Sequence, residues 1–238
     1  MLHDKDIREP LFDFMDETYG KVRIIEEKTI GCSRADVVMV TEDSLYGIEI
    51  KSDADTYKRL KTQVKDYDKY YDYNYIVVGS THALHVENYV PGHWGIVSVE
   101  EIDGTLDFYI LRKSGPNPKM VWKKKLEILW RPELALLQEL NMMPKYKEKS
   151  KAFVVEKIAE RIENQKIDAN VFMKQMCELL FERDYNTVEQ LKEDFRDKEI
   201  RRIRELERDP ETFMELERKR EIARQNFGHT RKKRRRRR

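Results

Sequence analysis

The spacing of apolar side chains predicts a helix, three strands, a second helix, a strand and a hairpin in the first half of the chain. The two helices repeat apolar residues every three to four positions, and each strand is a short apolar run between turn-forming residues. This order is typical of an α/β core with a mixed central sheet flanked by helices. The helices are predicted at residues 4–18 and 52–72, and the strands at 22–30, 35–40, 44–52, 75–80, 95–101 and 105–113.

Two local signals place the ends of these elements. Ser52, Asp53 and Asp55 are residue types that cap helices, so one of them is predicted to begin the second helix. The pair Asp103-Gly104 predicts a tight turn between the last two strands.

Beyond residue 115 the pattern becomes helical. The stretch SGPNPK at 114–119 predicts a linker, and it is followed by an all-α C-terminal region. Helices are predicted at 132–141, 150–164, 168–182, 187–208 and 210–226, and the last two are dominated by charged residues. The predicted division is a core at 1–115, a helical extension at 116–183, charged helices at 184–230 and a disordered polybasic tail at 231–238.

Charge is divided unevenly along the chain, although the formal net charge is only +2. Residues 1–115 hold 14 Lys and Arg against 22 Asp and Glu, whereas residues 116–238 hold 33 against 23. An acidic half suits a site that concentrates carboxylates, and a basic half suits contact with a polyanion. P-loop, dinucleotide-binding and nucleophile-elbow motifs are absent from the sequence, so the chemistry of those classes has no support.

The strand at 44–52 carries the sharpest chemical signal. Glu49 and Lys51 are two positions apart and therefore share one face of the strand, and Asp36 lies on the strand before it. If the two strands form a hairpin, Asp36 and Glu49 face each other. Two close carboxylates repel unless a cation lies between them, and hard oxygen ligands suit Mg²⁺ or Mn²⁺. The alternative interpretation is an ion-pair ladder on a half-exposed sheet, without catalytic chemistry.

The array D-x(12)-E-x-K in this strand-turn-strand setting resembles the PD-(D/E)XK nuclease superfamily, through Asp36, Glu49, Ile50 and Lys51. The similarity extends over about residues 5–183 and is most specific in the stretch EIKSDADTYKRLKTQ, as in a small bacterial and phage branch. One departure is Ala35, where the family motif has Pro. The resemblance implies a restriction-endonuclease-like core.

The resemblance also implies roles for single residues. In that family the Asp, the Glu and the backbone carbonyl between Glu and Lys hold the metal, which here are Asp36, Glu49 and Ile50. An acid upstream of the Asp often completes the set of metal ligands. The candidates for this acid are Glu26, Glu27, Asp16 and Glu17, of which Glu27 is preferred. A polar residue of the following helix often joins the catalytic group, and Gln63 occupies that position.

Basic side chains near this site and in the tail are predicted to contact nucleic-acid phosphates, because such contacts release counterions. They are Arg34, Arg59, Lys61, Arg231, Lys232 and Lys233. DNA is the expected partner, and a homodimer is the arrangement that would cut both strands in one encounter.

The sequence thus predicts an Mg²⁺-dependent endonuclease that hydrolyses phosphodiester bonds in DNA, with Mn²⁺ as the other metal that fits. The competing hypothesis is a nucleic-acid-binding or interaction protein that keeps the nuclease fold with weak or no cleavage.

The N-terminus lacks the apolar region of a signal peptide, and no run approaches the ~20 apolar residues of a membrane span. With only Cys32 and Cys177, far apart, a reducing compartment is expected. The resemblance to bacterial and phage proteins implies the cytoplasm of a bacterial host cell, for a bacterial or a phage-encoded protein.

Overall fold

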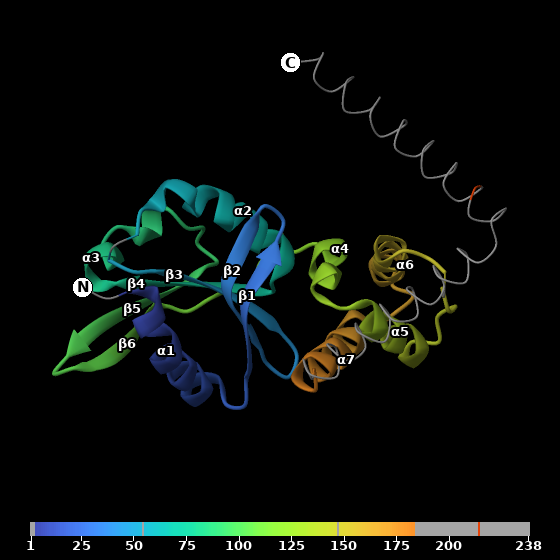
Figure 1. Ribbon diagram of the computed structural model, residues 1–238, viewed down its shortest axis with the longest axis horizontal. Coiled ribbons are helices and arrows are strands. Elements are labelled where there is room, and N and C mark those ends of the chain that lie inside the picture. Colours follow the sequence, from blue (N-terminus) through green and yellow to red (C-terminus); the bar gives the residue numbers. More distant parts are fainter. Residues whose placement is uncertain (1–2, 54, 147, 184–213, 215–238) are drawn as a thin grey trace, which may run out of the picture. The chain divides into compact units, whose positions relative to one another are not determined.

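The structure, a computed structural model, describes residues 3–53, 55–146, 148–183 and 214, and strands in these residues form one six-stranded mixed sheet (Figure 1). They are β1 (Arg23–Ile30), β2 (Ser33–Val40), β3 (Leu45–Lys51), β4 (Tyr73–Gly79), β5 (Gly95–Ile102) and β6 (Thr105–Arg112). The strands lie in chain order across the sheet. β3, β4 and β5 pair parallel, and the other neighbours pair antiparallel. The predicted mixed α/β core is confirmed.

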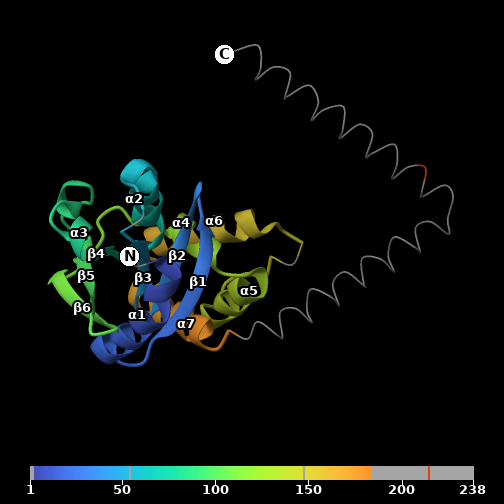
Figure 2. The ribbon, with the colours of Figure 1, turned by 60° about the vertical axis from the view of Figure 1, so that its left-hand side comes forward.

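Helices cover both faces of the sheet (Figures 1 and 2). α1 (Asp4–Tyr19) lies on one face, and α2 (Leu60–Tyr70) lies on the other, preceded by the 3-10 turn η1 (Tyr57–Arg59). The remaining helical segments are α3 (Ser80–Ala83), η2 (Val86–Asn88), α4 (Trp122–Lys125), η3 (Leu126–Ile128), α5 (Arg131–Leu140), α6 (Lys151–Glu163) and α7 (Ala169–Phe181). None of the helices within the described residues is long and apolar enough to cross a bilayer.

The sheet separates two apolar clusters. Ile7, Leu11 and Met15 of α1 pack on one face, against strand residues that include Ile48 and Ile50. On the other face the buried residues of α2 join the side chains of the C-terminal helices in a single cluster. β4 lies at the centre of the sheet and is buried on both faces. The burial of apolar side chains in the two clusters stabilises the core.

The second helix begins later than the sequence predicted. Asp55 accepts hydrogen bonds from the backbone N–H of Ser52 (2.9 Å) and from its hydroxyl (2.8 Å), and Asp53 accepts one from the Thr81 hydroxyl (2.6 Å). Because a carboxylate can compete for nearby backbone N–H groups, these acids hold the segment as a loop instead of capping a helix. Regular helix begins only at Leu60.

The predicted helices at 132–141, 150–164 and 168–182 are confirmed as α5, α6 and α7. They share the apolar cluster of the α2 face, so Met1–Arg183 forms one compact unit. The helices predicted at 187–208 and 210–226 and the tail at 231–238 lie outside the described residues, apart from the exposed Met214.

Two ion pairs stabilise the C-terminal helices, one to the core and one among themselves. Lys125 of α4 is fully buried and donates to Asp72, whose other oxygen accepts the backbone N–H of Leu45 at 2.9 Å. Arg183 donates two hydrogen bonds of 2.7 Å to Glu133. A buried charge left without its partner destabilises a protein strongly, so the first pair holds α4 against the core and the second holds the end of α7 against α5.

Two tyrosine rings lie directly on β3 at Gly47. A Cβ atom there would stand 2.6 Å from Cδ1 of Tyr67 and would overlap the ring of Tyr71. The missing side chain therefore allows α2 to approach β3 closely, and this approach brings the Tyr67 hydroxyl to the point where the pairing of β2 with β3 ends.

We expect Gly47→Ala to lower the free energy of unfolding by about 1–3 kcal/mol, because the added methyl group overpacks the α2 face. Urea unfolding followed by circular dichroism measures the change. The control is Gly92→Ala, since no atom lies within 4 Å of its added Cβ. Equal stability of the two variants would show that α2 can move away from β3 at no cost.

Candidate active site

The structure brings Asp36 and Glu49 together at the point where β2 and β3 separate. The antiparallel pairing ends with Val37 opposite Ile48, and one further step of this register places Asp36 opposite Glu49. Beyond this point the Asp36 side chain takes the place of a backbone acceptor of β2, because its Oδ2 accepts the backbone N–H of Ile50 at 2.9 Å. The N–H and C=O of one strand residue point to the same side, so the Ile50 carbonyl also faces Asp36.

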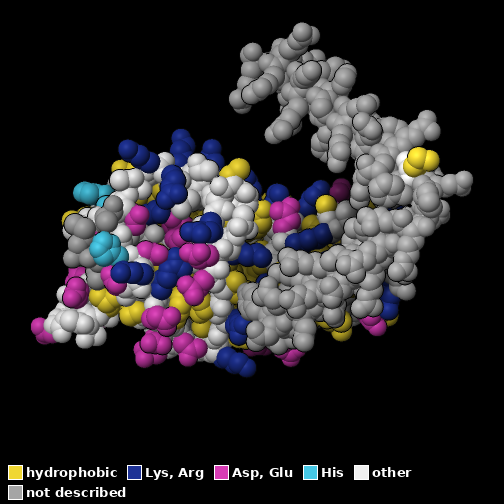
Figure 3. All heavy atoms as spheres, in the orientation of Figure 1, with side chains coloured by type: hydrophobic (Ala, Val, Ile, Leu, Met, Phe, Trp, Pro, Cys, Tyr) yellow, Lys and Arg dark blue, Asp and Glu magenta, His cyan; other side chains and the backbone are white. Residues whose placement is uncertain are grey.

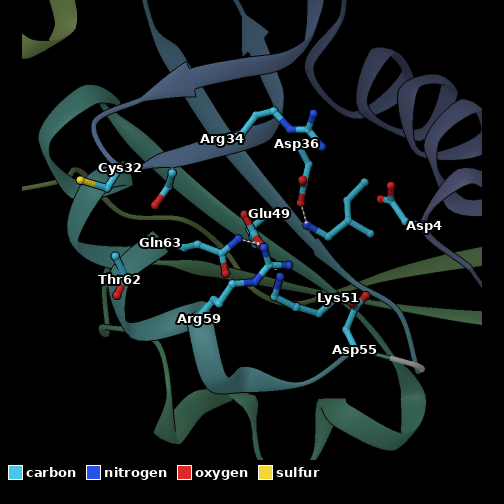
Figure 4. A pocket seen from close by; sticks show the side chains of 12 residues that line it. Asp4, Cys32, Arg34, Asp36, Glu49, Lys51, Asp55, Arg59, Thr62 and Gln63 are labelled. Atoms are coloured by element: carbon cyan, nitrogen blue, oxygen red, sulfur yellow. Dashed lines mark hydrogen bonds and ion pairs between the residues drawn. The ribbon is translucent and has the colours of Figure 1, made fainter.

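Glu49 is completely buried and is surrounded by donors. Its Oε1 accepts hydrogen bonds from Nζ of Lys51 and from Nε2 of Gln63, and its Oε2 accepts one from the Tyr67 hydroxyl at 2.7 Å. A buried carboxylate needs such partners, and here one comes from β3 and two from α2. The predicted group of Glu49, Lys51 and Gln63 is therefore assembled in space (Figure 4).

Tyr67 joins the two acidic positions. Besides donating to Glu49, its hydroxyl accepts the backbone N–H of Asp36 at 3.1 Å. Burial, together with the nearby Glu49 carboxylate, raises the pKa of Tyr67 well above its usual value, so the hydroxyl remains a donor. Tyr67 lies one helical turn after Gln63, so both side chains reach Glu49 from the same face of α2.

A cavity of about 590 Å³ opens beside these side chains (Figure 4). Its walls come from the turn after β1, the start of β2, the end of β3, the loop after β3 and the start of α2. The turn is held against α2 because Asp66 accepts the Cys32 N–H at 3.0 Å and the Ser33 hydroxyl at 2.8 Å. Asp36, Glu49, Lys51 and Gln63 all line the cavity.

Asp4 at the start of α1 also lines the cavity, and sequence analysis missed it. Arg8 donates two hydrogen bonds to its Oδ2, at 3.0 and 2.8 Å, and a third to the Asp36 carbonyl at 3.4 Å. The other oxygen of Asp4, Oδ1, is buried and has no hydrogen-bond partner among the described residues. The available signal was the i, i+4 pair of Asp4 and Arg8, which does not by itself indicate a site.

The four upstream acids considered from the sequence are absent from the lining of this cavity. Glu27 lies across from Asp36, but its φ is +52°, and its half-exposed side chain pairs with Arg34 at 3.1 Å and with Arg8 at 3.8 Å. Glu26 pairs with Arg8 at 2.9 Å. Asp16 and Glu17 belong to the other end of α1.

Two of the six basic residues predicted to contact phosphates line the cavity. Arg34 and Arg59 line it, and Lys61 is exposed on the first turn of α2. Lysine and arginine side chains are visible over α2 in Figure 3. Arg231, Lys232 and Lys233 lie outside the described residues.

The donor atoms at the cavity are of the type that Mg²⁺ or Mn²⁺ prefers. They comprise the carboxylates of Asp36 and Glu49, the Ile50 carbonyl, and two buried oxygens without a hydrogen-bond partner in the described part of the chain, Asp4 Oδ1 and Gln63 Oε1. All are hard oxygen ligands, so the residues fit such a cation. Within the described residues no three acidic, His or Cys side chains stand as a ready-made metal cluster, so the carbonyl and amide oxygens are needed.

Burial, and after it the neighbouring Glu49 carboxylate, raise the pKa of Asp36 to about 7. The hydrogen bond from Ile50 and the charge of Lys51 act in the opposite direction. The pKa of this acid is lower in the unfolded chain than in the folded, metal-free protein. Its ionisation therefore favours the unfolded state and lowers the free energy of unfolding.

Asp36→Asn is therefore expected to gain stability relative to the wild type as pH rises from about 4 to about 7, on the order of 4 kcal/mol by pH 8. Near pH 4 the acid is protonated in the folded protein, so the two proteins should be alike. Urea unfolding in EDTA across this range measures the difference, with the exposed Asp13→Asn as the control. A difference that stays constant from pH 4.5 to 8 would contradict the raised pKa.

Comparison with known proteins places the chain in a family. The model for the family "Bacteriophage P4 protein cII" matches residues 2–206. Among solved structures, that of Pyrococcus furiosus SfsA in complex with Ca²⁺ is similar, with a TM-score of 0.30 and 16% identity over 47% of this chain and 62% of the SfsA chain. No match was found among curated proteins. Since the family match covers most of the sequence, the chain belongs to the family of bacteriophage P4 protein cII.

Proposed function

We propose that this protein is a metal-dependent endonuclease that hydrolyses phosphodiester bonds in DNA. The observation that carries the proposal is the convergence of Asp36, Glu49 and Lys51 on one cavity, from two strands that separate at that point. This is the arrangement that the resemblance to the PD-(D/E)XK superfamily implies.

The acids Asp36 and Glu49 and the carbonyl of Ile50 would hold Mg²⁺, or Mn²⁺ in its place. Asp4 is the upstream acid that the geometry favours, since its Oδ1 is buried, unpartnered among the described residues and at the cavity. Glu27 was preferred from the sequence, but its carboxylate pairs with Arg34. When bound, a divalent cation supplies charge stabilisation to the phosphodiester and makes a water molecule more acidic.

Lys51 provides the positive charge beside the phosphate. Its ammonium group is almost fully buried, and a charge in such a site stabilises the charge that develops in the transition state more strongly than it would in water. Gln63 and Tyr67 orient the Glu49 carboxylate through their hydrogen bonds, so we assign them positioning roles.

DNA would reach the cavity along its basic rim. Arg34 and Arg59 at the lining and Lys61 on α2 are placed to bind phosphates, and the tail residues Arg231, Lys232 and Lys233 would add non-specific affinity. A homodimer would allow both strands to be cut in one encounter. These activities would belong to the cytoplasm of the host cell, where DNA is accessible.

A second candidate function is nucleic-acid binding without cleavage. One observation favours it, because Oε1 of Glu49 is already engaged by both Lys51 and Gln63. If these bonds persist when metal is present, Glu49 serves the fold and not the cation.

Plasmid cleavage separates the two candidates. We expect wild-type protein to nick or linearise plasmid DNA with Mg²⁺ or Mn²⁺ and not in EDTA. Lys51→Gln and Glu49→Gln should each lower the rate by about 100-fold or more, because each removes a charge from the site. The exposed Lys113→Gln is the control and should cleave like wild type. Binding of DNA without cleavage by the wild type would favour the second candidate.

Metal binding identifies the upstream acid without reference to activity. We expect Mn²⁺ to raise the melting temperature of the wild type, because a ligand that binds only the folded state stabilises it. The shift should shrink in Asp36→Asn and in Asp4→Asn and persist in Glu27→Gln. If the shift is lost in Glu27→Gln and retained in Asp4→Asn, the upstream acid that binds the metal is Glu27 and not Asp4.

A further inference from the structure

Three aromatic side chains form a cluster on the other side of the loop that borders the cavity. Tyr57 of η1 lies between His82 of α3 and Tyr89, which follows η2. Its ring centroid is 4.5 Å from that of Tyr89 and 5.1 Å from that of His82. The Tyr89 side chain is 52% exposed, and Leu84 nearby in the chain is 77% exposed. We call Tyr57, His82 and Tyr89 the aromatic shelf.

The shelf contains polar atoms that the fold does not use. The Tyr57 hydroxyl and Nε2 of His82 are both buried, and neither has a hydrogen-bond partner among the described residues. A buried polar atom without a partner costs stability, so a feature of this kind calls for a role outside packing. The exposed ring of Tyr89 is the part of the shelf that a ligand can reach, and it presents a flat face.

The shelf and the cavity share one loop. Tyr57 stands two residues from Asp55 and two residues from Arg59, and both of these line the cavity. Since consecutive Cα atoms are about 3.8 Å apart, the Tyr57 Cα lies within about 8 Å of each. The hydrogen bond of 2.6 Å between Thr81 and Asp53 ties the loop to α3, so the shelf holds its place beside the cavity.

Positive charge borders the same loop. Lys58, Arg59 and Lys61 are all exposed. Figure 3 shows lysine and arginine side chains over α2 and histidine side chains beside α3 on one face of the molecule. A chain with phosphates along its backbone and aromatic rings at its side matches this combination of charge and exposed aromatic surface.

We propose that the aromatic shelf binds an unstacked nucleobase of the strand whose phosphate enters the cavity, so that the protein engages DNA as an unpaired strand. The proposal rests on the proposed function in placing a phosphate at Lys51. Bases inside a duplex are already stacked and paired, whereas an unpaired base can offer its face to Tyr89. The ring stack would then select frayed ends, flaps or single strands over intact duplex.

Fluorescence of 2-aminopurine tests this without any cleavage. The probe is a single-stranded DNA oligonucleotide with one 2-aminopurine, titrated with the full chain in EDTA, and the comparison is the same oligonucleotide in a duplex. Wild-type protein should quench the single strand, because stacking quenches this base. Tyr89→Ala should weaken single-strand binding by about 5- to 100-fold and leave duplex binding unchanged.

Two matched variants make the result specific. Tyr89→Phe keeps the ring face and should bind the single strand like the wild type. Tyr109→Ala removes a tyrosine of similar exposure, 47%, from β6 and should also bind like the wild type. Single-strand affinity of Tyr89→Ala within twofold of the wild type would overturn the proposal and point to a protein partner for the shelf. An equal loss in Tyr109→Ala would also overturn it, because the effect would then not be specific to the shelf.

The two proposals fail separately. If Tyr89→Ala loses single-strand binding but the wild type cleaves nothing with Mg²⁺ or Mn²⁺, the shelf stands and the hydrolase proposal falls. If the wild type cleaves DNA and Tyr89→Ala binds single strands equally well, the hydrolase stands and the shelf proposal falls.

Discussion

The site depends on keeping the Glu49 carboxylate where water does not reach it. Removing a charged group from water is unfavourable unless hydrogen bonds and opposite charge replace its hydration. Lys51 supplies the charge, and Gln63 and Tyr67 supply the hydrogen bonds. Because the last two belong to α2, a shift of that helix would remove two of the three hydrogen bonds to the carboxylate. The site therefore keeps its geometry only if α2 packs closely on β3. Gly47 allows this packing, because it leaves room for the rings of Tyr67 and Tyr71.

A second consequence is that the site is assembled from both faces of the sheet. α2 approaches from one face, and Asp4 reaches the cavity from α1, which packs on the other. Arg8 makes this possible, because its guanidinium group binds the Asp4 carboxylate and the Asp36 carbonyl together. The separation of β2 and β3 leaves the space in which these groups meet.

The parts of this arrangement that follow local periods could be predicted from the sequence. The two-residue period of strands places Glu49 with Lys51, and the hairpin register places Asp36 opposite Glu49. The start of α2 could not be predicted, because Asp53 bonds to Thr81, a residue 28 positions away. The cavity position of Asp4 depends on how α1 docks, and the direction of Glu27 depends on a positive φ; no local pattern encodes either.

The bidentate pair of Arg183 and Glu133 has an evolutionary consequence. Arg183 also lies 4.0 Å over the ring of Trp130, so its guanidinium group is enclosed on several sides. Changing either member alone would strand a charge inside the protein, whereas replacing both by apolar residues of similar volume could be tolerated. Across relatives of this chain, the two positions should therefore vary together, as a covarying couple 50 residues apart in sequence.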